Sequence, residues 1–228
     1  MSRHEVTTRR VLYKIPGMRS VPTTDDSFIG ADGQPLPIRV YEAIRPRTDT
    51  TASPIVVLVE GYPSAGFQKH MGCTFMEMEW TISMAQLVAA SGVTAVTHSN
   101  RDPPPDARAL LRHLGAGGRR VGIWAVSGHG PVALEAAASA TCAVLINPVT
   151  KDFYPETPLY IARAGKDETP GLNVALDALM ARAIAENRPI SVVNHADAPH
   201  AFDLCHASEM TRFVLQQGLA FLRLYLRA

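Results

Sequence analysis

The sequence predicts an α/β fold built on a doubly wound, mostly parallel β-sheet with helices on both faces. From residue 54 onward, short runs rich in Val and Ile alternate with longer segments of helical pattern, and the connections are short. Most of these runs are continuously apolar, which is typical of strands buried on both faces of a parallel sheet. The chain has 228 residues, a length that one α/β domain can bury around a single core, so we expect one domain over residues 1–228.

The first fifty residues predict two strands that are joined by turns rather than by a helix. Val11–Ile15 is largely apolar and ends at a Pro-Gly pair. Residues 36–42 follow an Asp-Gly turn signal and alternate between apolar and polar side chains. Strands linked in this way favour an antiparallel edge at the N-terminal end of the sheet. Residues 45–54 are polar and rich in breakers, which is typical of a surface loop.

The remaining elements follow from apolar runs, a helix-initiating proline and glycine stops. Residues 61–66 are expected to form a loop. Strands are expected at 54–59, 93–97, 121–126, 143–146, 159–163 and 190–193, and helices at 77–90, 103–114, 131–140, 172–187 and 211–227. No internal repeat, low-complexity tract or second domain is recognisable.

The charge balance and the cysteine spacing exclude several functional classes. The 22 basic and 21 acidic side chains leave a net charge of +1, which gives no electrostatic reason to expect nucleic acid or an anionic membrane as a partner. Cys73, Cys142 and Cys205 form neither a disulfide framework nor a zinc motif. There is no recognisable export signal, and no stretch reaches the roughly 18 apolar residues that span a bilayer. We therefore expect a cytoplasmic monomer or homodimer that acts on a small molecule.

A serine stands directly after a predicted strand, where parallel sheets present their reactive groups. Ser127 follows the run 121–126 and precedes a helix, so its hydroxyl is expected on a sharp strand-to-helix turn. The helix N-terminus behind it favours negative charge. Small neighbours are needed because the strand and the helix pack closely at this turn. Ala125 meets that requirement, whereas His129 does not.

A nucleophilic serine needs a base, and the base needs an orienting carboxylate. Asp167 and His200 each lie in the loop region beyond a predicted strand. The resulting chain order of Ser, Asp and His is that of the α/β-hydrolase triad. His195 and Asp197 form a second candidate pair close to His200, so the order by itself leaves the identity of the base open.

Three segments resemble α/β-hydrolases near the dienelactone hydrolases. Residues 122–134 (GIWAVSGHGPVAL) resemble the nucleophile turn of that family. Residues 164–168 (AGKDE) resemble its acid loop, and residues 198–203 (APHAFD) resemble its histidine loop. The resemblance extends from residue 54 to the C-terminus and implies the α/β-hydrolase fold.

The same resemblance implies a catalytic triad of Ser127, Asp167 and His200. It favours His200 over His195, because the residues around His200 fit the small-x-His-x-Phe pattern of the histidine loop. Dienelactone hydrolases proper use a cysteine nucleophile, so their lactone specificity is not carried over to a chain with a serine there. His129 is a second departure, because it replaces a residue that is usually small.

Backbone amides are the expected donors to the oxyanion, because they are fixed dipoles that need little reorganisation. Gly128 follows the nucleophile and offers one N–H. We expect the second from Tyr62, in the loop after the strand at 54–59. The alternative is that Gly61-Tyr62-Pro63 is simply a turn.

The substrate site is expected to be open. Only residues 147–158 separate two successive strands at the point where many lipases and epoxide hydrolases insert a helical cap. We therefore expect no cap domain and small or medium esters as substrates. Candidate pocket residues are Gly61, Tyr62, Phe67, His129, Phe153, Tyr154 and Phe202. For His129 the favoured interpretation is a partly exposed residue at the start of a helix, and the alternatives are a second base or a pocket-lining donor.

Neither a metal ion nor an organic cofactor is expected. His70, His98, His113 and His206 lack the spacing of metal ligands. The glycine-rich run at 115–118 precedes a strand instead of following one, which is the wrong place for a dinucleotide phosphate.

Together these features predict hydrolysis of a carboxylic ester through an acyl-enzyme. Two alternatives stay open at this point. One is a non-catalytic binding protein that keeps the fold. The other is an enzyme that uses the same serine to transfer an acyl group to an alcohol, amine or thiol, or to hydrolyse a peptide.

Overall fold

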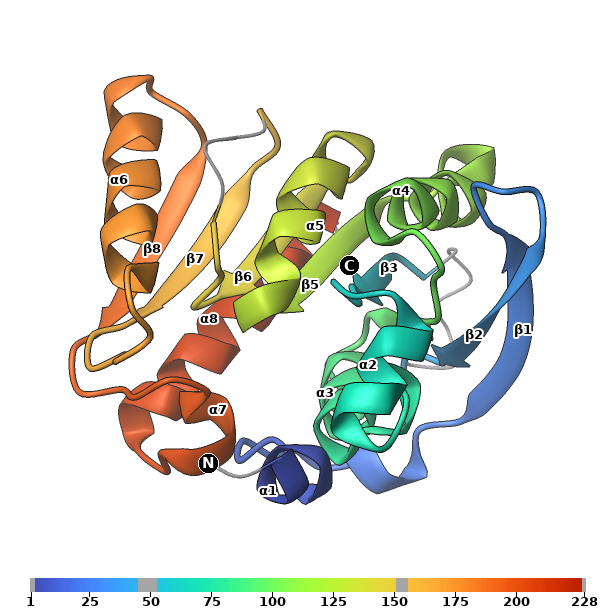
Figure 1. Ribbon diagram of the computed structural model, residues 1–228, viewed down its shortest axis with the longest axis horizontal. Coiled ribbons are helices and arrows are strands. Elements are labelled where there is room, and N and C mark those ends of the chain that lie inside the picture. The colour runs from blue at the N-terminus through green and yellow to red at the C-terminus, as the bar shows by residue number, and fades with distance from the viewer. Residues whose placement is uncertain (1–2, 45–52, 151–155, 227–228) are drawn as a thin grey trace.

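A mixed β-sheet with helices on both faces forms the centre of the structure (Figure 1). The computed structural model describes residues 3–44, 53–150 and 156–226. The strands of the sheet are β1 (Thr23–Ile29), β2 (Pro35–Tyr41), β3 (Ile55–Leu58), β4 (Thr94–His98), β5 (Val121–Val126), β6 (Cys142–Ile146), β7 (Leu159–Ala164) and β8 (Ile190–His195).

Helices connect most of these strands. The α-helices are α1 (Arg3–Thr8), α2 (Ser64–Met71), α3 (Glu79–Ala90), α4 (Pro103–Leu114), α5 (Gly130–Ala136), α6 (Leu172–Ala185), α7 (Phe202–Cys205) and α8 (Glu209–Leu226). Short 3-10 turns are η1 (Met18–Ser20), η2 (Phe75–Glu77), η3 (Ala116–Gly118), η4 (Ser127–His129) and η5 (Ala137–Ser139). None of the described helices combines the length and the apolar character that a membrane span requires.

The order of the strands places a switch point between β3 and β5. The sheet runs β1-β2-β4-β3-β5-β6-β7-β8, with β3 to β8 parallel and with β1 and β2 joined antiparallel at one edge. The chain leaves β3 toward β4 on one side and then returns to β5 on the other side. In open α/β sheets, ligands bind at the carboxyl ends of the strands where the order reverses in this way.

Each face of the sheet has its own apolar core. Successive side chains of a strand point to opposite faces. On β5, Trp124 therefore packs in the cluster formed with α3 and α8, whereas Ile123 and Ala125 pack in the cluster formed with α4, α5 and α6. All three side chains are fully buried. A strand buried on both faces can be apolar at every position, which explains the continuous runs in the sequence.

The predicted doubly wound, mostly parallel sheet with an antiparallel edge is confirmed. The strands predicted from residue 54 onward all form, with their bounds shifted by no more than two residues. The helix at 103–114 and the strand at 121–126 begin and end where the sequence predicts. The turn from β5 into the next helix therefore lies where the sequence placed it.

The prediction for the N-terminal strands is partly wrong. Val11–Ile15 is not a strand: the Val11 N–H donates a hydrogen bond of 2.9 Å to Ser83 Oγ on α3, so this segment packs across a helix. The edge strand is β1, in which only Phe28 is buried. Because an edge strand is largely solvated, its sequence lacks the apolar pattern that marks the central strands.

Three helices were also absent from the prediction. The expected loop at 61–66 contains the start of α2, and neither α1 nor α7 was predicted. α1 has six residues and α7 has four, so each is too short to show the helical periodicity on which the prediction depended.

The carboxylate of Asp106 joins the β1–β2 hairpin to the start of α4 through hydrogen bonds. Asp106 is buried, and its side-chain oxygens accept hydrogen bonds from the backbone N–H groups of Ala31 (2.7 Å), Arg101 (2.8 Å) and Asp102 (2.9 Å). Ala31 lies in the turn between β1 and β2, so one side chain satisfies amides from the hairpin and from the start of the helix.

We expect Asp106→Ala to lower the free energy of unfolding by about 1–3 kcal/mol, because it leaves three partly buried N–H groups without their acceptor. Asp106→Asn keeps one acceptor oxygen and should lose less. Urea denaturation of both variants measures the difference. Equal stability of Asp106→Ala and the wild type would contradict this account of the hairpin.

Candidate active site

Ser127 lies on a sharp turn at the end of β5. Its backbone φ is 46°, a left-handed conformation that is uncommon for a residue with a side chain. The turn is packed from outside: a Cβ added at Gly130 would lie 2.4 Å from the carbonyl oxygen of Val149. The requirement for a small residue is therefore met at Gly130 rather than at His129. This arrangement is the strand-turn-helix geometry of a nucleophile turn.

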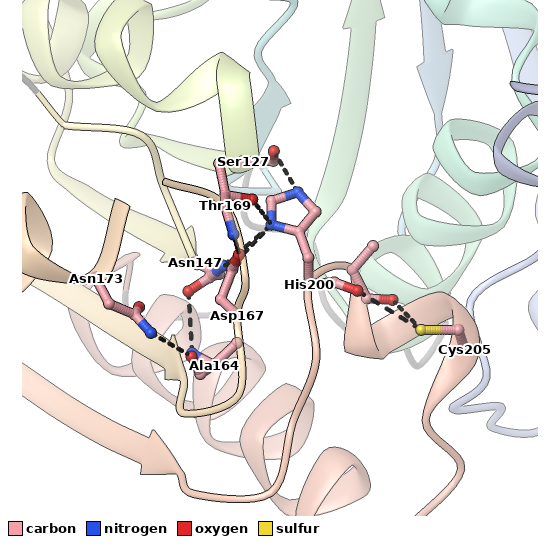
Figure 2. Close-up of polar contacts among 9 residues, drawn as sticks. Ser127, Asn147, Ala164, Asp167, Thr169, Asn173, His200 and Cys205 are labelled. Atoms are coloured by element: carbon pink, nitrogen blue, oxygen red, sulfur yellow. Dashed lines mark hydrogen bonds and ion pairs between the residues drawn. The ribbon is translucent and has the colours of Figure 1, made fainter. Parts of the chain in front are cut away.

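The structure brings Ser127, His200 and Asp167 into one hydrogen-bonded chain (Figure 2). Ser127 Oγ lies 2.8 Å from His200 Nε2, and His200 Nδ1 lies 2.5 Å from Asp167 Oδ2. The imidazole thus faces the serine hydroxyl with one nitrogen and the carboxylate with the other. This is the geometry of a Ser-His-Asp triad.

The sheet brings these side chains together although they are far apart in the sequence. Asp167 follows β7 and His200 follows β8, and these strands are parallel neighbours. Their loops are also joined directly, because the Lys166 N–H donates a hydrogen bond of 2.8 Å to the carbonyl oxygen of Ala198. A Cβ at Gly165 would lie 2.3 Å from the Ala196 carbonyl oxygen, so only glycine permits this approach.

The Asp167 carboxylate is buried but has several donors. Its Oδ1 accepts the Thr169 N–H at 2.7 Å, and its Oδ2 accepts short hydrogen bonds from the Asn147 side-chain amide and from His200. Burial raises the pKa of Asp167, but the hydrogen bonds from Thr169 and His200 outweigh it and hold the pKa below its ordinary value. Asp167 is therefore ionised where it faces the His200 ring.

Asn147 is a site residue that the sequence analysis missed. Its side-chain Oδ1 accepts the Ala164 N–H at 3.0 Å while its Nδ2 bonds Asp167, so it ties the end of β7 to the carboxylate. Its φ is 44°, a conformation in which Asn is enriched. An Asn placed directly after a buried strand and before Pro148 was the available signal.

The second candidate pair, His195 and Asp197, does not take part in the hydrogen bonds that link Ser127, His200 and Asp167. His195 is buried, with its Nε2 3.2 Å from the hydroxyls of Ser208 and Thr211. Asp197 is exposed and forms an ion pair with Lys166 at 2.8 Å. Neither residue lines the cavity that contains Ser127.

A cavity of about 760 Å³ opens beside Ser127 and His200. Of the predicted pocket residues, Tyr62, Phe67, His129 and Phe202 line it, and Gly61 does not. Phe153 and Tyr154 lie outside the described residues. The prediction missed most of the apolar wall, which also includes Val6, Met71, Phe75, Met78, Trp80 and Leu204. These residues come from segments that are distant in the sequence, so no local pattern marked them.

The expectation of a partly exposed His129 is wrong. The imidazole is 9% exposed, its ring centroid lies 4.9 Å from that of Phe75, and its Nδ1 accepts the Gly61 N–H at 2.7 Å. Burial lowers the pKa of His129 to about 4. The 3-10 turn η4 directs the ring beneath the loop after β3, where it is a neutral hydrogen-bond acceptor.

The predicted oxyanion donor Tyr62 directly follows the residue that makes this contact. Gly61 donates to His129, whereas the Tyr62 N–H has no acceptor within the described part of the chain. The Tyr62 ring covers the nucleophile turn, since a Cβ at Gly128 would lie 1.9 Å from its hydroxyl oxygen. A larger residue at position 128 would therefore require the Tyr62 ring to move.

No described cluster of three or more His, Cys, Asp or Glu side chains is arranged to hold a metal ion.

Glu60 is a buried carboxyl next to the loop that carries Tyr62. Its Oε2 accepts hydrogen bonds from Ser64 Oγ (2.5 Å) and Asn100 Nδ2 (3.0 Å), and its Oε1 is buried without a partner in the described structure. Burial raises the pKa of Glu60 to about 8, although the Ser64 hydrogen bond acts in the opposite direction. The side chain is therefore largely neutral at pH 7.

We expect Glu60→Gln to flatten the pH dependence of stability. The pKa of Glu60 is about 8 in the folded protein against 4.5 for an ordinary glutamate, so its contribution to stability is fully present below pH 4.5 and is lost as the pH rises to about 8. The loss is at most roughly 5 kcal/mol. Urea unfolding of both proteins across this range checks it. Identical pH profiles of wild type and Glu60→Gln would contradict the prediction.

Comparisons with known proteins identify the fold. No protein-family model and no curated protein sequence matches the chain. A hyperthermophilic esterase from the archaeon Pyrobaculum calidifontis matches with a TM-score of 0.69 and 17% identity, over 92% of this chain and 89% of that chain. An α/β-hydrolase enzyme from the metagenome of Lake Arreo matches with a TM-score of 0.72 and 15% identity, over 99% and 88%.

A peptidase of greater length shares the same architecture. Dipeptidyl peptidase 4 from Porphyromonas gingivalis matches with a TM-score of 0.70 and 12% identity, over 89% of this chain but only 35% of the peptidase chain. The chain thus spans about a third of the length of that protein. With the strand order and the turn at Ser127, these matches show that the chain has the α/β-hydrolase fold.

Proposed function

We propose that the protein is a serine hydrolase that cleaves carboxylic esters through an acyl-enzyme. The observation that carries the proposal is the hydrogen-bonded chain from Ser127 through His200 to Asp167 at the wall of an apolar cavity. These distances support the roles of nucleophile, base and acid that we assign to Ser127, His200 and Asp167.

In the first half of the reaction Ser127 Oγ attacks the ester carbonyl carbon, and His200 Nε2 accepts the hydroxyl proton. The ionised Asp167 stabilises the imidazolium and keeps its Nδ1–H directed toward the carboxylate. The backbone N–H groups of Tyr62 and Gly128 bind the oxyanion of the tetrahedral intermediate. His200 then donates its proton to the departing alkoxide, which leaves as an alcohol.

In the second half a water molecule attacks the acyl-enzyme. His200 takes a proton from this water, and the intermediate collapses to release the carboxylic acid and restore the Ser127 hydroxyl. All the proton transfers occur at one imidazole, so the chain's own residues are sufficient for both steps.

The comparisons favour esters over peptides as substrates. The Pyrobaculum calidifontis esterase matches along most of both chains, whereas the peptidase match is confined to about a third of that protein. The three sequence segments that resemble dienelactone hydrolases support a relation to that group, which we also propose. Ser127 in place of cysteine separates the present site from lactone specificity.

The cavity favours an uncharged, apolar acyl group. Its volume of about 760 Å³ lies in the range of pockets that hold whole small-molecule ligands, well above the size of an acetyl group. The wall includes the buried side chains of Phe75, Met78, Phe202 and Leu204. An extended alkyl or aryl group would remove this apolar surface from water, which stabilises the bound state.

We expect Ser127→Ala to abolish hydrolysis of p-nitrophenyl butyrate and labelling by a fluorophosphonate, because both reactions need the serine oxygen. Absorbance of released nitrophenol and labelling of intact protein measure the two effects. Wild type that neither turns over nor labels would overturn the proposal and favour a binding protein. Turnover that requires an added alcohol, amine or thiol would favour an acyltransferase.

We expect kcat/KM to rise from p-nitrophenyl acetate to the hexanoate by about fourfold for each methylene that the cavity buries, since one buried methylene contributes about 0.8 kcal/mol. Gly66 lines the cavity, and a Cβ there would meet no atom within 4 Å. Gly66→Phe should therefore reduce activity on the hexanoate far more than on the acetate, with Gly66→Ala as the matched control. If the enzyme is active through Ser127 but kcat/KM does not change with the length of the acyl chain, the proposed preference for longer acyl groups is wrong, whereas the proposed ester hydrolysis stands.

A further inference from the structure

The hydrogen-bond ladder of the sheet continues beyond the end of β3. In a strand, successive backbone N–H groups point alternately to the two neighbouring strands. The Val59 N–H donates to the carbonyl oxygen of Trp124 on β5 at 3.0 Å. The next two donors find side chains instead of backbone: Glu60 N–H donates to His98 Nε2 (3.2 Å) and Gly61 N–H donates to His129 Nδ1 (2.7 Å).

The two imidazoles come from the strands that flank β3. His98 is the last residue of β4, and His129 follows β5 in the turn η4. Each histidine therefore continues the ladder on its own side of β3, at positions where the neighbouring strands no longer offer a carbonyl oxygen. Tyr62 is the next residue, and its N–H is the first in this series that has no acceptor within the described residues.

The hydrogen bonds also fix the tautomer of each ring. His98 Nε2 faces an N–H group, and its Nδ1 lies 3.2 Å from the Ser99 carbonyl oxygen, so the proton is on Nδ1. His129 uses Nδ1 as the acceptor, so its proton is on Nε2. Each ring is an acceptor only while it is neutral.

The packing around the two rings leaves the loop little freedom. His98 is fully buried. The His129 ring lies against Phe75, Tyr62 and Phe67, at centroid distances of 4.9, 5.5 and 6.1 Å. A Cβ at Gly61 would lie 2.6 Å from His129 Cα, so the loop and the nucleophile turn are already in contact.

We propose that His98 and His129 are positioning residues for the oxyanion site: they accept the amide hydrogens of Glu60 and Gly61 and thereby hold the Tyr62 N–H toward the carbonyl that Ser127 attacks. The inference rests on the proposed function, because it assigns the two rings a role in ester hydrolysis. Neither ring touches the reacting atoms; both act through the loop. At the position of His129, a small residue would satisfy the turn but would leave Gly61 without its acceptor.

Burial keeps both rings neutral at neutral pH, although some of the groups that face His98 act against it. Burial lowers the pKa of both His98 and His129 to about 4, and the proximity of His98 adds to the effect on His129. Asp106 and the Ser99 carbonyl oxygen act in the opposite direction on His98. Glu60, the carboxyl closest to the loop, is itself largely neutral because burial raises its pKa to about 8.

The test uses the different acceptor atoms of the two rings. An asparagine Oδ1 can take the place of His129 Nδ1, and a glutamine Oε1 can take the place of His98 Nε2. We therefore expect His129→Asn and His98→Gln to keep most of the activity, and His129→Leu and His98→Leu to lose it. Steady-state hydrolysis of p-nitrophenyl butyrate gives kcat and KM separately for each variant.

We expect kcat of His129→Leu to fall about 100-fold, the size of effect seen when one oxyanion donor is lost or misplaced, with KM changed much less. The Ki of butylboronic acid, which forms a tetrahedral anion on the serine, should rise in parallel. If His129 only stabilised the fold, its substitution would leave this Ki unchanged. Tyr160→Phe is the matched control, because it removes another buried hydrogen bond, the one of 2.9 Å to the Val214 carbonyl oxygen.

Several outcomes would overturn the inference. They are an unchanged kcat and boronate Ki in His129→Leu, equal losses in His129→Asn and His129→Leu, or losses that follow the melting temperature in the same way as Tyr160→Phe. If His129→Leu does not fold, His129→Gln provides the test, because its longer side chain cannot place an acceptor at the Nδ1 position. If the wild type shows no Ser127-dependent turnover at all, the proposed function itself is wrong.

Discussion

The turn at Ser127 is the constraint on which the rest of the site depends. A non-glycine residue at a φ of 46° is strained, at a cost of order 1–3 kcal/mol, and persists only where its surroundings hold it. The Val149 N–H does so by donating to the Ser127 carbonyl oxygen at 2.8 Å. Gly128 and Gly130 allow the loops after β3 and β6 to approach the turn directly. The loops after β3 and β6 therefore both pack directly against this turn.

Near this turn burial keeps the side chains of Glu60, His98 and His129 neutral, whereas Asp167 is ionised. Glu60, His98 and His129 have few partners, and burial shifts the pKa of each toward its neutral form. Asp167 instead receives hydrogen bonds from Thr169, Asn147 and His200, and it stays ionised. The Asp167 carboxylate thus lies beside the His200 imidazole, while the loop after β3 is held by neutral acceptors.

The segment before β1 contributes to the site in a way that its sequence does not reveal. Val6 on α1 lines the cavity, and the Leu12 N–H donates to the Asp203 carbonyl oxygen on α7 at 2.9 Å. The Asp203 carboxylate in turn accepts the Trp80 indole N–H at 2.6 Å. These contacts connect the segment before β1 with α3 and α7, so the apolar wall is assembled from parts of the chain that are distant in sequence.

The sequence by itself determined the parallel sheet and the places of Ser127 and Asp167, because a strand buried on both faces can be apolar throughout and its end is then visible in the chain. The place of His200 followed from the likeness of its flanking residues to a histidine loop, since the strand before it, β8, is largely exposed. The ends of the strands at 54–59 and 121–126 also indicated Tyr62 and Gly128 as candidate oxyanion donors. Only the tertiary structure decided the roles of Asn147 and His129, since each bonds a group from a different strand. It likewise decided the edge strand β1 and the cavity wall, because solvated strands and short helices carry little periodic pattern, and a wall is defined by neighbours in space.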